Sequence, residues 1–382
     1  MPKNICLDEI SIYPIKSTAE IQLSTAWIDD FSLSFDRRLV LSDMNGKFIT
    51  ARTHASICLI KSQLTKSGLV LTAPNMPKLF INTQSFSESY ESVTVWDSDI
   101  NAQHCSDKYD QWFSQYIGIP CRLVYFGDNS SRQVKNSDKQ VAFSDGYPLL
   151  LISKASLDDL SSRVGQSLSM SQFRPNLVTN NEIPYEEDTW KRIRIGEVEF
   201  EVVKPCSRCI FTTIDPKTAT KDENKEPLNT LTQYRQVEKG DVMFGQNLIA
   251  VNNGAVSVGD KIEVLETQNP PTFKKNVQTT QSKPTSKEVV VNSKPRIHFS
   301  STNKTIKGNN QDTILEQAED NNVFIPYSCR GGMCGSCKIK LNSGEVTHLA
   351  VDGLTQEEFE NGYILACSTI PKTDISIDES GS

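Results

Sequence analysis

Long apolar runs and an excess of basic residues are both missing from this chain of 382 residues. No stretch approaches the roughly 20 apolar residues of a membrane span, and the first residues lack the apolar core of a secretory signal. The 40 Lys and Arg residues are outnumbered by 47 Asp and Glu residues, which disfavours a surface for a nucleic-acid polymer. We therefore expect a cytoplasmic protein that binds neither a membrane nor a nucleic-acid polymer.

Phosphate-binding glycine motifs are missing as well. The chain contains neither Gly-x-Gly-x-x-Gly nor a Walker loop, so it carries no nucleotide fingerprint. The first 267 residues have a strand-rich pattern without strand–helix alternation, which argues against a parallel doubly wound sheet. Residues 192–203 alternate around Gly196 and predict a hairpin. Residues 156–164 have helical spacing behind a Ser156 cap. The expected fold class is α+β and mostly β.

A polar segment with three prolines marks the clearest expected boundary. Such a stretch cannot bury enough surface to fold alone, so it predicts a linker. The part of the chain after this linker has the size of one small domain. A second polar stretch, near residue 130, suggests another boundary. The expected domains are 1–130, 131–267 and 295–382, with the linker at 268–294.

Four of the ten cysteines are scattered singly along the chain. Lone cysteines are mostly small, buried apolar groups, so we expect a structural role for these four, which are Cys6, Cys58, Cys105 and Cys121.

Four other cysteines have the spacing of a plant-type [2Fe–2S] site, C-x4-C-x2-C with a fourth cysteine after 29 further residues. Three thiolates then come from one loop, where Gly331, Gly332 and Gly335 allow left-handed backbone. Backbone N–H groups can point at the sulfurs and tune the reduction potential. A four-cysteine zinc site is the alternative, but zinc usually takes two short cysteine pairs. The expected ligands of the cluster are Cys329, Cys334, Cys337 and Cys367.

The flanks of this motif predict further structure. Asp312 is expected to cap a helix, and Thr355 with Glu358 to form a capping box. Residues 345–382 hold eight carboxylates against one lysine. That excess fits either a solvated surface or docking to the basic face of a reductase. The segment 295–380 resembles plant-type ferredoxins.

A second cysteine pair, Cys206 and Cys209, has the spacing C-x2-C. It could be half of a zinc site, although no second pair or nearby histidine completes one. It could be a redox dithiol, but that type opens a helix, whereas residues 210–214 form a β-favouring run. It could also bind a soft metal already held by a cofactor, or have a purely structural role. Spacing alone leaves these options open.

Several separate stretches of the first 267 residues resemble the MOSC domains, the family of the molybdenum cofactor sulfurase C-terminal domain, preceded by their N-terminal β-barrel partner. With the ferredoxin, the layout resembles the bacterial YcbX-like proteins, and the mitochondrial amidoxime reducing component is a relative without the fused ferredoxin. The resemblance implies a β-barrel-like N-terminal domain, a MOSC β-barrel and a β-grasp ferredoxin domain. The matching stretches are Tyr13–Ser17, Phe35–Arg38, Ile49–Arg52, Asp145–Leu149, Phe173–Asn176, Cys206–Cys209, Phe244–Asn247 and Val258–Asp260.

The resemblance also implies a molybdenum cofactor, molybdopterin with its metal bound by Cys209. A thiolate suits this role because sulfur is a soft ligand. Cationic and N–H donors are expected around the pterin phosphate. Tyr147 and Asn247 differ from the residues of the eukaryotic relative. The residues implied to contact the cofactor are Lys16, Ser17, Arg37, Asp145, Arg174, Asn176, Ser207 and Cys209.

The function implied by the resemblance is the reduction of N-hydroxylated compounds, such as N-hydroxylated purines or amidoximes, to the corresponding N–H compounds. The expected electron donor is an NAD(P)H-dependent flavin reductase acting through the [2Fe–2S] cluster. Asp215 or a water near Cys209 could supply protons. Two alternatives stay open at this point, a sulfur carrier or sulfurtransferase and a non-catalytic electron-transfer module.

Overall fold

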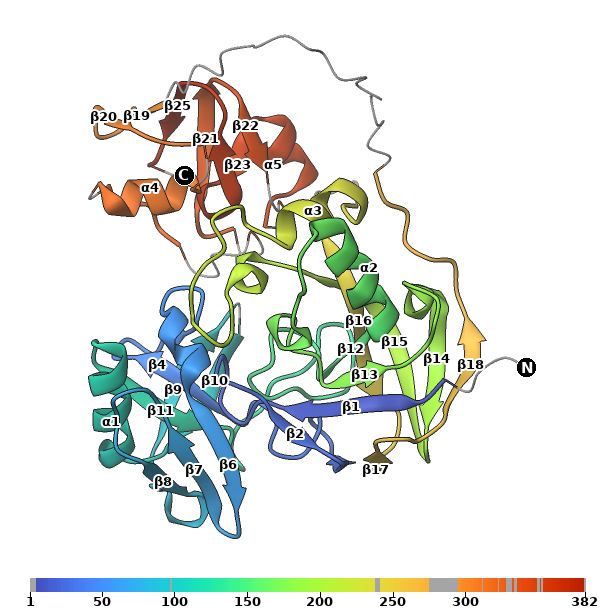
Figure 1. Cartoon of the computed structure of the whole chain (residues 1–382). Coiled ribbons are helices and arrows are strands. Elements are labelled where there is room, and N and C mark those ends of the chain that lie inside the picture. Colours follow the sequence, from blue (N-terminus) through green and yellow to red (C-terminus); the bar gives the residue numbers. More distant parts are fainter. Residues whose placement is uncertain are drawn as a thin grey trace. The chain divides into compact units, whose positions relative to one another are not determined.

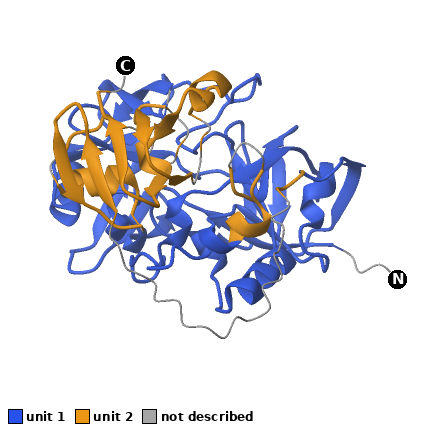
Figure 2. Cartoon of the chain, turned by 90° about the horizontal axis from the view of Figure 1, so that it is seen from above, with its two compact units in different colours: residues 1–230, 244–271 blue, residues 231–243, 272–382 orange. Residues whose placement is uncertain are grey.

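The computed structural model describes residues 5–96, 98–237, 241–274, 295–310, 312–321, 323–327, 332, 335–348, 351 and 353–380. Most of the expected linker lies outside these residues. Within them, no helix is long and apolar enough to cross a membrane. The chain forms two compact units, residues 1–230 with 244–271 and residues 231–243 with 272–382 (Figure 2).

An eight-stranded sheet organises half of the first unit, in the order β18-β14-β15-β16-β12-β13-β1-β2 (Figure 1). β12 and β13 are parallel. Its apolar face forms a core with Trp190 and Phe200 fully buried. The strands are β1 (Leu7–Ile12), β2 (Ile21–Leu23), β12 (Leu149–Ser153), β13 (Leu177–Thr179), β14 (Trp190–Ile195), β15 (Val198–Ser207), β16 (Met243–Ala250) and β18 (Ile262–Thr267).

The hairpin expected at residues 192–203 is present as β14 and β15. Ile195 pairs with Val198 across Gly196, which has a φ of +57°. The helix expected at residues 156–164 is α2 (Lys154–Val164), but Ser156 is not its cap. The helix begins after Ser153, and the Ser156 hydroxyl instead donates a hydrogen bond of 2.7 Å to the buried Glu187. The expectation about Ser156 was therefore wrong, because a tertiary partner attracts its hydroxyl.

The other half of the first unit contains a five-stranded sheet, β5-β4-β11-β10-β9, and a three-stranded sheet, β6-β7-β8. Helix α1 (Asp107–Ile117) covers their shared core, which includes Trp112 and Phe113. A separate pair joins β3 (Thr25–Ile28) and β17 (Gly254–Ser257). The remaining strands are β4 (Leu39–Asp43), β5 (Phe48–Ile49), β6 (Lys61–Thr65), β7 (Gly68–Thr72), β8 (Leu79–Asn82), β9 (Tyr90–Val95), β10 (Ser98–His104) and β11 (Cys121–Tyr125).

The start of the chain contributes to both cores. β1 and β2 lie in the sheet built mainly from residues 149–267, whereas Ile15 and residues from Leu39 onward belong to the other core. The chain therefore passes from the first core to the other near residue 15, returns by residue 21, and crosses again between Leu33 and Leu39. The domain boundary expected near residue 130 stays a prediction.

The second unit contains a five-stranded sheet, β20-β19-β25-β21-β23, in which β19 and β25 are parallel. Among the described residues, its core is formed by side chains from residues 297–377. The short helix α3 (Leu228–Tyr234) leads into its segment 231–243. The other elements are β19 (Arg296–Phe299), β20 (Lys304–Lys307), α4 (Ile314–Asp320), β21 (Lys338–Ser343), β22 (Val346–His348), α5 (Gln356–Glu360), β23 (Tyr363–Leu365), β24 (Thr369–Pro371) and β25 (Ile375–Asp378).

Two helix caps in this unit were predicted, with different outcomes. The capping box of Thr355 and Glu358 at the start of α5 is confirmed. The cap expected at Asp312 was wrong, since Thr313 caps α4 and forms a capping box with Glu316. Both Asp and Thr are good cap residues, and only the reciprocal bond with the glutamate decides between them. The expected mostly β class with few helices is confirmed.

Candidate functional site

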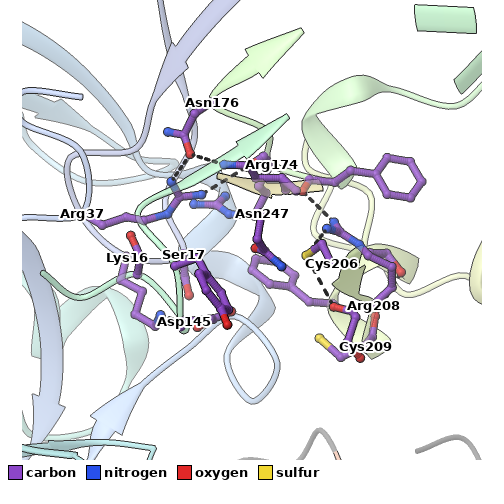
Figure 3. A pocket seen from close by; sticks show the side chains of 18 of the residues that line it. Lys16, Ser17, Arg37, Asp145, Arg174, Asn176, Cys206, Arg208, Cys209 and Asn247 are labelled. Carbon is purple, nitrogen blue, oxygen red and sulfur yellow. Dashed lines mark hydrogen bonds and ion pairs between the residues drawn. The ribbon is translucent and has the colours of Figure 1, made fainter. Parts of the chain in front are cut away.

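One pocket of the first unit is lined by all eight residues that the sequence predicted around a cofactor. They come from loops after β1, before β4 and before β12, from the segment before β13 and from the end of β15. In Figure 3, Lys16 and Asp145 lie on one side of the pocket, and Cys206, Arg208 and Cys209 lie on the other. The fold thus brings together residues more than 190 positions apart, Lys16 and Cys209 among them.

Three of these residues have a left-handed backbone. The φ angles are +74° at Ser17, +47° at Arg37 and +57° at Arg174. For side-chain-bearing residues this conformation costs roughly 1–2 kcal/mol each. Such strain gathers at functional sites, where the surrounding structure holds it in place. Three of the eleven described non-glycine residues with a positive φ thus line this pocket.

Lys16 and Asp145 form the polar end of the pocket. The Lys16 ammonium donates to Asp145 Oδ1 at 2.5 Å and to the Phe143 carbonyl at 2.7 Å. Burial lowers the pKa of Lys16 to about 8, although Asp145 opposes this shift. Asp145 Oδ1 also accepts from Trp96 Nε1 at 3.1 Å and lies 3.6 Å from Arg52 Nη2. Burial would raise the pKa of Asp145, but the charges of Lys16 and Arg52 outweigh it and hold that pKa well below its usual range.

Arg37 and Arg174 stack on the ring of the buried Tyr13. Their guanidinium carbons lie 4.5 and 4.1 Å from its centroid, a cation–π arrangement. Arg37 donates to Asp36 at 2.6 Å, and Arg174 donates to the Thr18 carbonyl at 2.7 Å. Arg174 Nη2 is buried without a hydrogen-bond partner among the described residues. One guanidinium nitrogen of this pair, with its two N–H groups, thus has no protein acceptor among the described residues.

The side chain of Asn176 makes hydrogen bonds that have a structural role. Its Nδ2 donates to the Ser11 carbonyl at 3.1 Å, and its Oδ1 accepts from Leu150 N at 3.2 Å and from Arg37 Nη1 at 3.1 Å. The side chain ties β1 to β12 and orients Arg37. It lines the pocket, as predicted, but most of its hydrogen-bonding capacity is already used.

The cysteine pair lies where β15 ends. Arg208 Nη1 donates to Cys206 Sγ at 3.1 Å, and Arg208 Nη2 donates to the Phe173 carbonyl at 2.6 Å. The Cys209 sulfur has no hydrogen bond within the described part of the chain, and its side chain is half-buried in the pocket wall. Of the two thiols, Cys209 is therefore the one left open for a ligand.

The β-favouring composition of residues 210–214 suggested a strand after Cys209, but the structure has none there. Residues Ile210–Thr213 form the 3₁₀ helix η5, with Cys209 at its N-cap position. Two threonine hydroxyls bond back to the carbonyls three residues earlier, Thr212 to Cys209 at 3.0 Å and Thr213 to Ile210 at 2.8 Å. These local bonds favour a turn over a strand.

Two of the expected cluster ligands are described in the second unit. Cys337 and Cys367 are buried. Backbone N–H groups point at both sulfurs, from Cys367 N to Cys337 Sγ at 3.5 Å and from Gly332 N to Cys367 Sγ at 3.3 Å. Gly332 and Gly335 have the left-handed backbone expected of them, with φ of +76° and +72°. The other two predicted ligands, Cys329 and Cys334, lie outside the described residues.

Comparisons with known proteins agree with this layout. Three family models match, the MOSC N-terminal beta barrel domain at residues 5–120, the MOSC domain at 138–263 and the 2Fe-2S iron-sulfur cluster binding domain at 297–372. Mitochondrial amidoxime-reducing component 1 of Mus musculus is 34% identical over 277 residues, which are 67% of this chain and 81% of that protein.

This chain belongs to the family of the amidoxime-reducing components. Mitochondrial amidoxime reducing component 2 of Bos taurus matches it at 33% identity, over 67% of this chain and 82% of that protein. Among solved structures, pectocin M2 matches 22% of this chain and 32% of its own at 34% identity, with a TM-score of 0.21. The resemblance inferred from the sequence is thus confirmed.

One residue that supports the pocket without lining it was not predicted in this family member. Arg132 is buried and donates to the carbonyls of Ala142, Ser144 and Asp145 at 3.0, 2.5 and 2.7 Å. It therefore fixes the loop that carries Asp145. Nothing in its polar surroundings in the sequence distinguishes it from a solvated arginine. Asp215, one of the two proton sources considered, accepts from Lys217 N at 2.8 Å and is not among the described residues that line the pocket.

Proposed function

We propose that this chain is a molybdenum-cofactor-dependent reductase of N-hydroxylated compounds. Family membership already makes it a molybdenum-dependent oxidoreductase. The proposed reaction is R–NH–OH + 2 e⁻ + 2 H⁺ → R–NH₂ + H₂O. It breaks the N–O bond, delivers both electrons to the substrate and releases the oxygen as water. The names of the relatives, which refer to amidoxime reduction, support this substrate class.

The observation that carries the proposal is the donor set of the pocket. Cys209 offers a soft thiolate ligand in the same pocket as five basic side chains and one carboxylate. Two buried guanidinium nitrogens, Arg174 Nη2 and Arg208 Nε, have no hydrogen-bond partner among the described residues. Such a set fits a metal-bearing group with an anionic tail, because buried cationic donors need partners.

Different residues would hold different parts of that group. Cys209 would bind the molybdenum, which supplies two-electron chemistry when bound. Lys16, Ser17, Arg37 and Arg174 would hold the pterin phosphate, with Arg as a bidentate fork and Lys as a point charge. Asp145 and Ser207 would offer acceptors to pterin N–H groups. The bonds of Asn176 to the backbone suit it to hold Arg37 in place.

Electrons are proposed to enter through the C-terminal domain. The match to the [2Fe–2S] family supports a cluster there, and such a cluster carries one electron at a time, so it would cycle twice per turnover. An NAD(P)H-dependent flavin reductase is the proposed donor. The relatives are named as mitochondrial, and the cytoplasmic location expected from the sequence stays a prediction.

The test uses the purified full-length chain with its cofactors, a flavin reductase, NADH and benzamidoxime. We expect one equivalent each of molybdenum and pterin, two of iron, and cofactor-dependent formation of benzamidine. Cys209→Ser should abolish turnover and molybdenum binding, whereas the matched Cys206→Ser should retain the metal. Iron without molybdenum or pterin would contradict the proposal and favour a sulfurtransferase. Unchanged turnover in Cys209→Ser would also contradict it.

A further inference from the structure

One aromatic ring in the pocket wall has no part in the proposed cofactor site. Tyr147 lies in the loop before β12, lines the pocket and is half-buried. Its ring packs against a small cluster of buried apolar residues, Val134, Val141 and Ile249. The cluster gives the ring a fixed apolar support, so that it is held in place rather than free to rotate into solvent.

A charged group backs this ring. Lys204 Nζ lies 5.5 Å from the centroid of Tyr147. Lys204 is exposed, and among the described residues it does not belong to the pocket lining. The ammonium group contacts the ring in cation–π geometry. Because Tyr147 lines the pocket and is only half-buried, part of its side chain is accessible to a ligand there.

The rings of the other aromatic residues of the described pocket lining already pack against other side chains. Phe173 is fully buried, and its ring centroid lies 4.6 Å from that of Phe244. Phe211 packs against the core around Trp112 and lies under the Arg174 guanidinium, 5.3 Å from its carbon. Tyr147 is thus the aromatic residue of the described lining best placed to stack on a bound molecule.

An amide lies in the same pocket wall. Asn247 is on β16, where it pairs with Leu150 of β12, and its Nδ2 donates to the Pro205 carbonyl at 3.3 Å. This bond fixes the amide and leaves Oδ1 as an acceptor. A flat ring with N–H groups on its edge would match an aromatic face and a nearby acceptor, the two features by which proteins hold unpaired bases.

We propose that Tyr147 is a specificity-determining residue that stacks on the planar ring of an N-hydroxylated heteroaromatic base, with Asn247 accepting from an N–H on its edge. This inference rests on the proposed function and assigns the residue that would favour its heteroaromatic substrates over those without a ring. Stacking on an aromatic side chain contributes enough affinity that removing it weakens binding about tenfold. Small N-hydroxylated compounds without a ring gain nothing from the same contact.

The experiment compares wild-type holoenzyme with Tyr147→Leu and Tyr147→Phe. The two substrates are 6-N-hydroxylaminopurine, which is planar, and acetamidoxime, which has no ring. We expect Tyr147→Leu to lower the ratio of their kcat/KM values about tenfold, through a higher KM for the purine, and Tyr147→Phe to restore the ratio. An unchanged ratio in Tyr147→Leu would overturn the inference.

A binding measurement separates this inference from the proposed function. Calorimetry with adenine, which cannot be reduced at an N–O bond, should show a Kd about tenfold higher for Tyr147→Leu than for wild type, and a near wild-type Kd for Tyr147→Phe. Equal Kd values in all three proteins, or no adenine binding to wild type, would reject the role of Tyr147. If adenine binds as expected but neither N-hydroxylated compound is reduced, the proposed function fails while the stacking site stands.

Discussion

Ser17 shows how a single residue can balance stability against binding. It holds a φ of +74° although it is not a glycine, and its side chain is buried at the pocket. We predict that Ser17→Gly raises the free energy of unfolding by about 1 kcal/mol, because glycine adopts this backbone without strain. The same change removes a hydroxyl from the pocket and should reduce pterin content. Urea unfolding and pterin analysis check both effects, and Ser17→Ala, which keeps the strain, should lose pterin without gaining stability.

The buried carboxyl of Glu187 should make the stability of the folded chain depend on pH, and this effect does not involve the pocket. It is fully buried, and burial raises its pKa to about 7 although a hydrogen bond from Ser156 opposes the shift. A carboxyl whose folded pKa exceeds the unfolded value of 4.5 favours the folded state at low pH. This contribution is complete below pH 4.5 and is lost as pH rises through 7.

Replacing Glu187 with glutamine should therefore remove that pH dependence. We expect the difference in free energy of unfolding, Glu187→Gln minus wild type, to increase by up to ~3 kcal/mol as the pH rises from 4.5 to 8. Each unit of pKa shift corresponds to about 1.4 kcal/mol. Urea unfolding at several pH values measures it. Glu186→Gln, next to it in the chain, is the control and should follow the wild-type curve. Parallel curves for wild type and Glu187→Gln would show that Glu187 titrates normally.

Residues in and around the pocket were predictable where a motif surrounds them and not where only the fold gives them a role. Lys16, Arg174 and Cys209 stand in recognisable stretches, and the structure brings them to one pocket. Arg132 stands in a polar stretch, and only the folded chain shows its guanidinium bonded to three carbonyls of one loop. The role of Asn176 as a bridge between β1 and β12 likewise depends on strand neighbours that are far apart in sequence.

Local bonds made some elements predictable from the sequence but not others. The capping box of α5 and the hairpin around Gly196 each depend on residues a few positions apart. The start of α2 and the turn at Ile210–Thr213 differed from expectation, because hydroxyl groups found partners that composition does not reveal. The place of β1 beside β13 depends on pairing across some 170 residues, which no local pattern encodes.

At the scale of elements, the contact between β12 and β16 yields a prediction. Gly245 on β16 has a φ of +78°, and a Cβ there would lie 2.9 Å from the Leu151 carbonyl oxygen and 2.6 Å from a carbon of Ile152. We expect Gly245→Ala to destabilise the chain by about 3 kcal/mol, since backbone strain and overpacking combine. Gly118, which ends α1 with a φ of +84° and has no atom within 4 Å of its added Cβ, is the matched control.

Gly118→Ala should cost only about 1 kcal/mol, the strain of a left-handed alanine. Urea unfolding of both variants gives the comparison. Equal losses in the two variants would mean that the β12–β16 contact relaxes around the added methyl group. Because β16 carries Asn247 into the pocket wall, a relaxed contact should also change the adenine affinity, which calorimetry would detect.

For the whole molecule, the main organisation was predictable from the sequence because each part carries its own motif. The cysteine spacing marked a ferredoxin, and the separate stretches of the first 267 residues marked the MOSC family, which the family matches confirm. The way in which the chain passes between two cores within the first 40 residues was not predictable. It depends on which apolar faces meet in the folded chain, and several strands offer equivalent faces.

The separate cores predict that the cluster site and the proposed molybdenum site assemble independently. The core of residues 297–377 includes Cys337 and Cys367 and, within the part of the chain that the structure describes, shares no residue with the cores that support the pocket. Cys367→Ser should therefore lose the [2Fe–2S] signal in electron paramagnetic resonance while molybdenum and pterin contents stay near wild type. Cys209→Ser should show the reverse, with molybdenum lost and the cluster signal kept.

Activity then separates the electron path from the reaction site. With NADH and the flavin reductase, both variants should be inactive. With reduced methyl viologen, a one-electron donor that does not need the cluster, Cys367→Ser should regain reduction of benzamidoxime and Cys209→Ser should not. Loss of molybdenum from Cys367→Ser would contradict independent assembly. Full activity of Cys367→Ser with the flavin reductase would show instead that electrons reach the pocket without the C-terminal cluster.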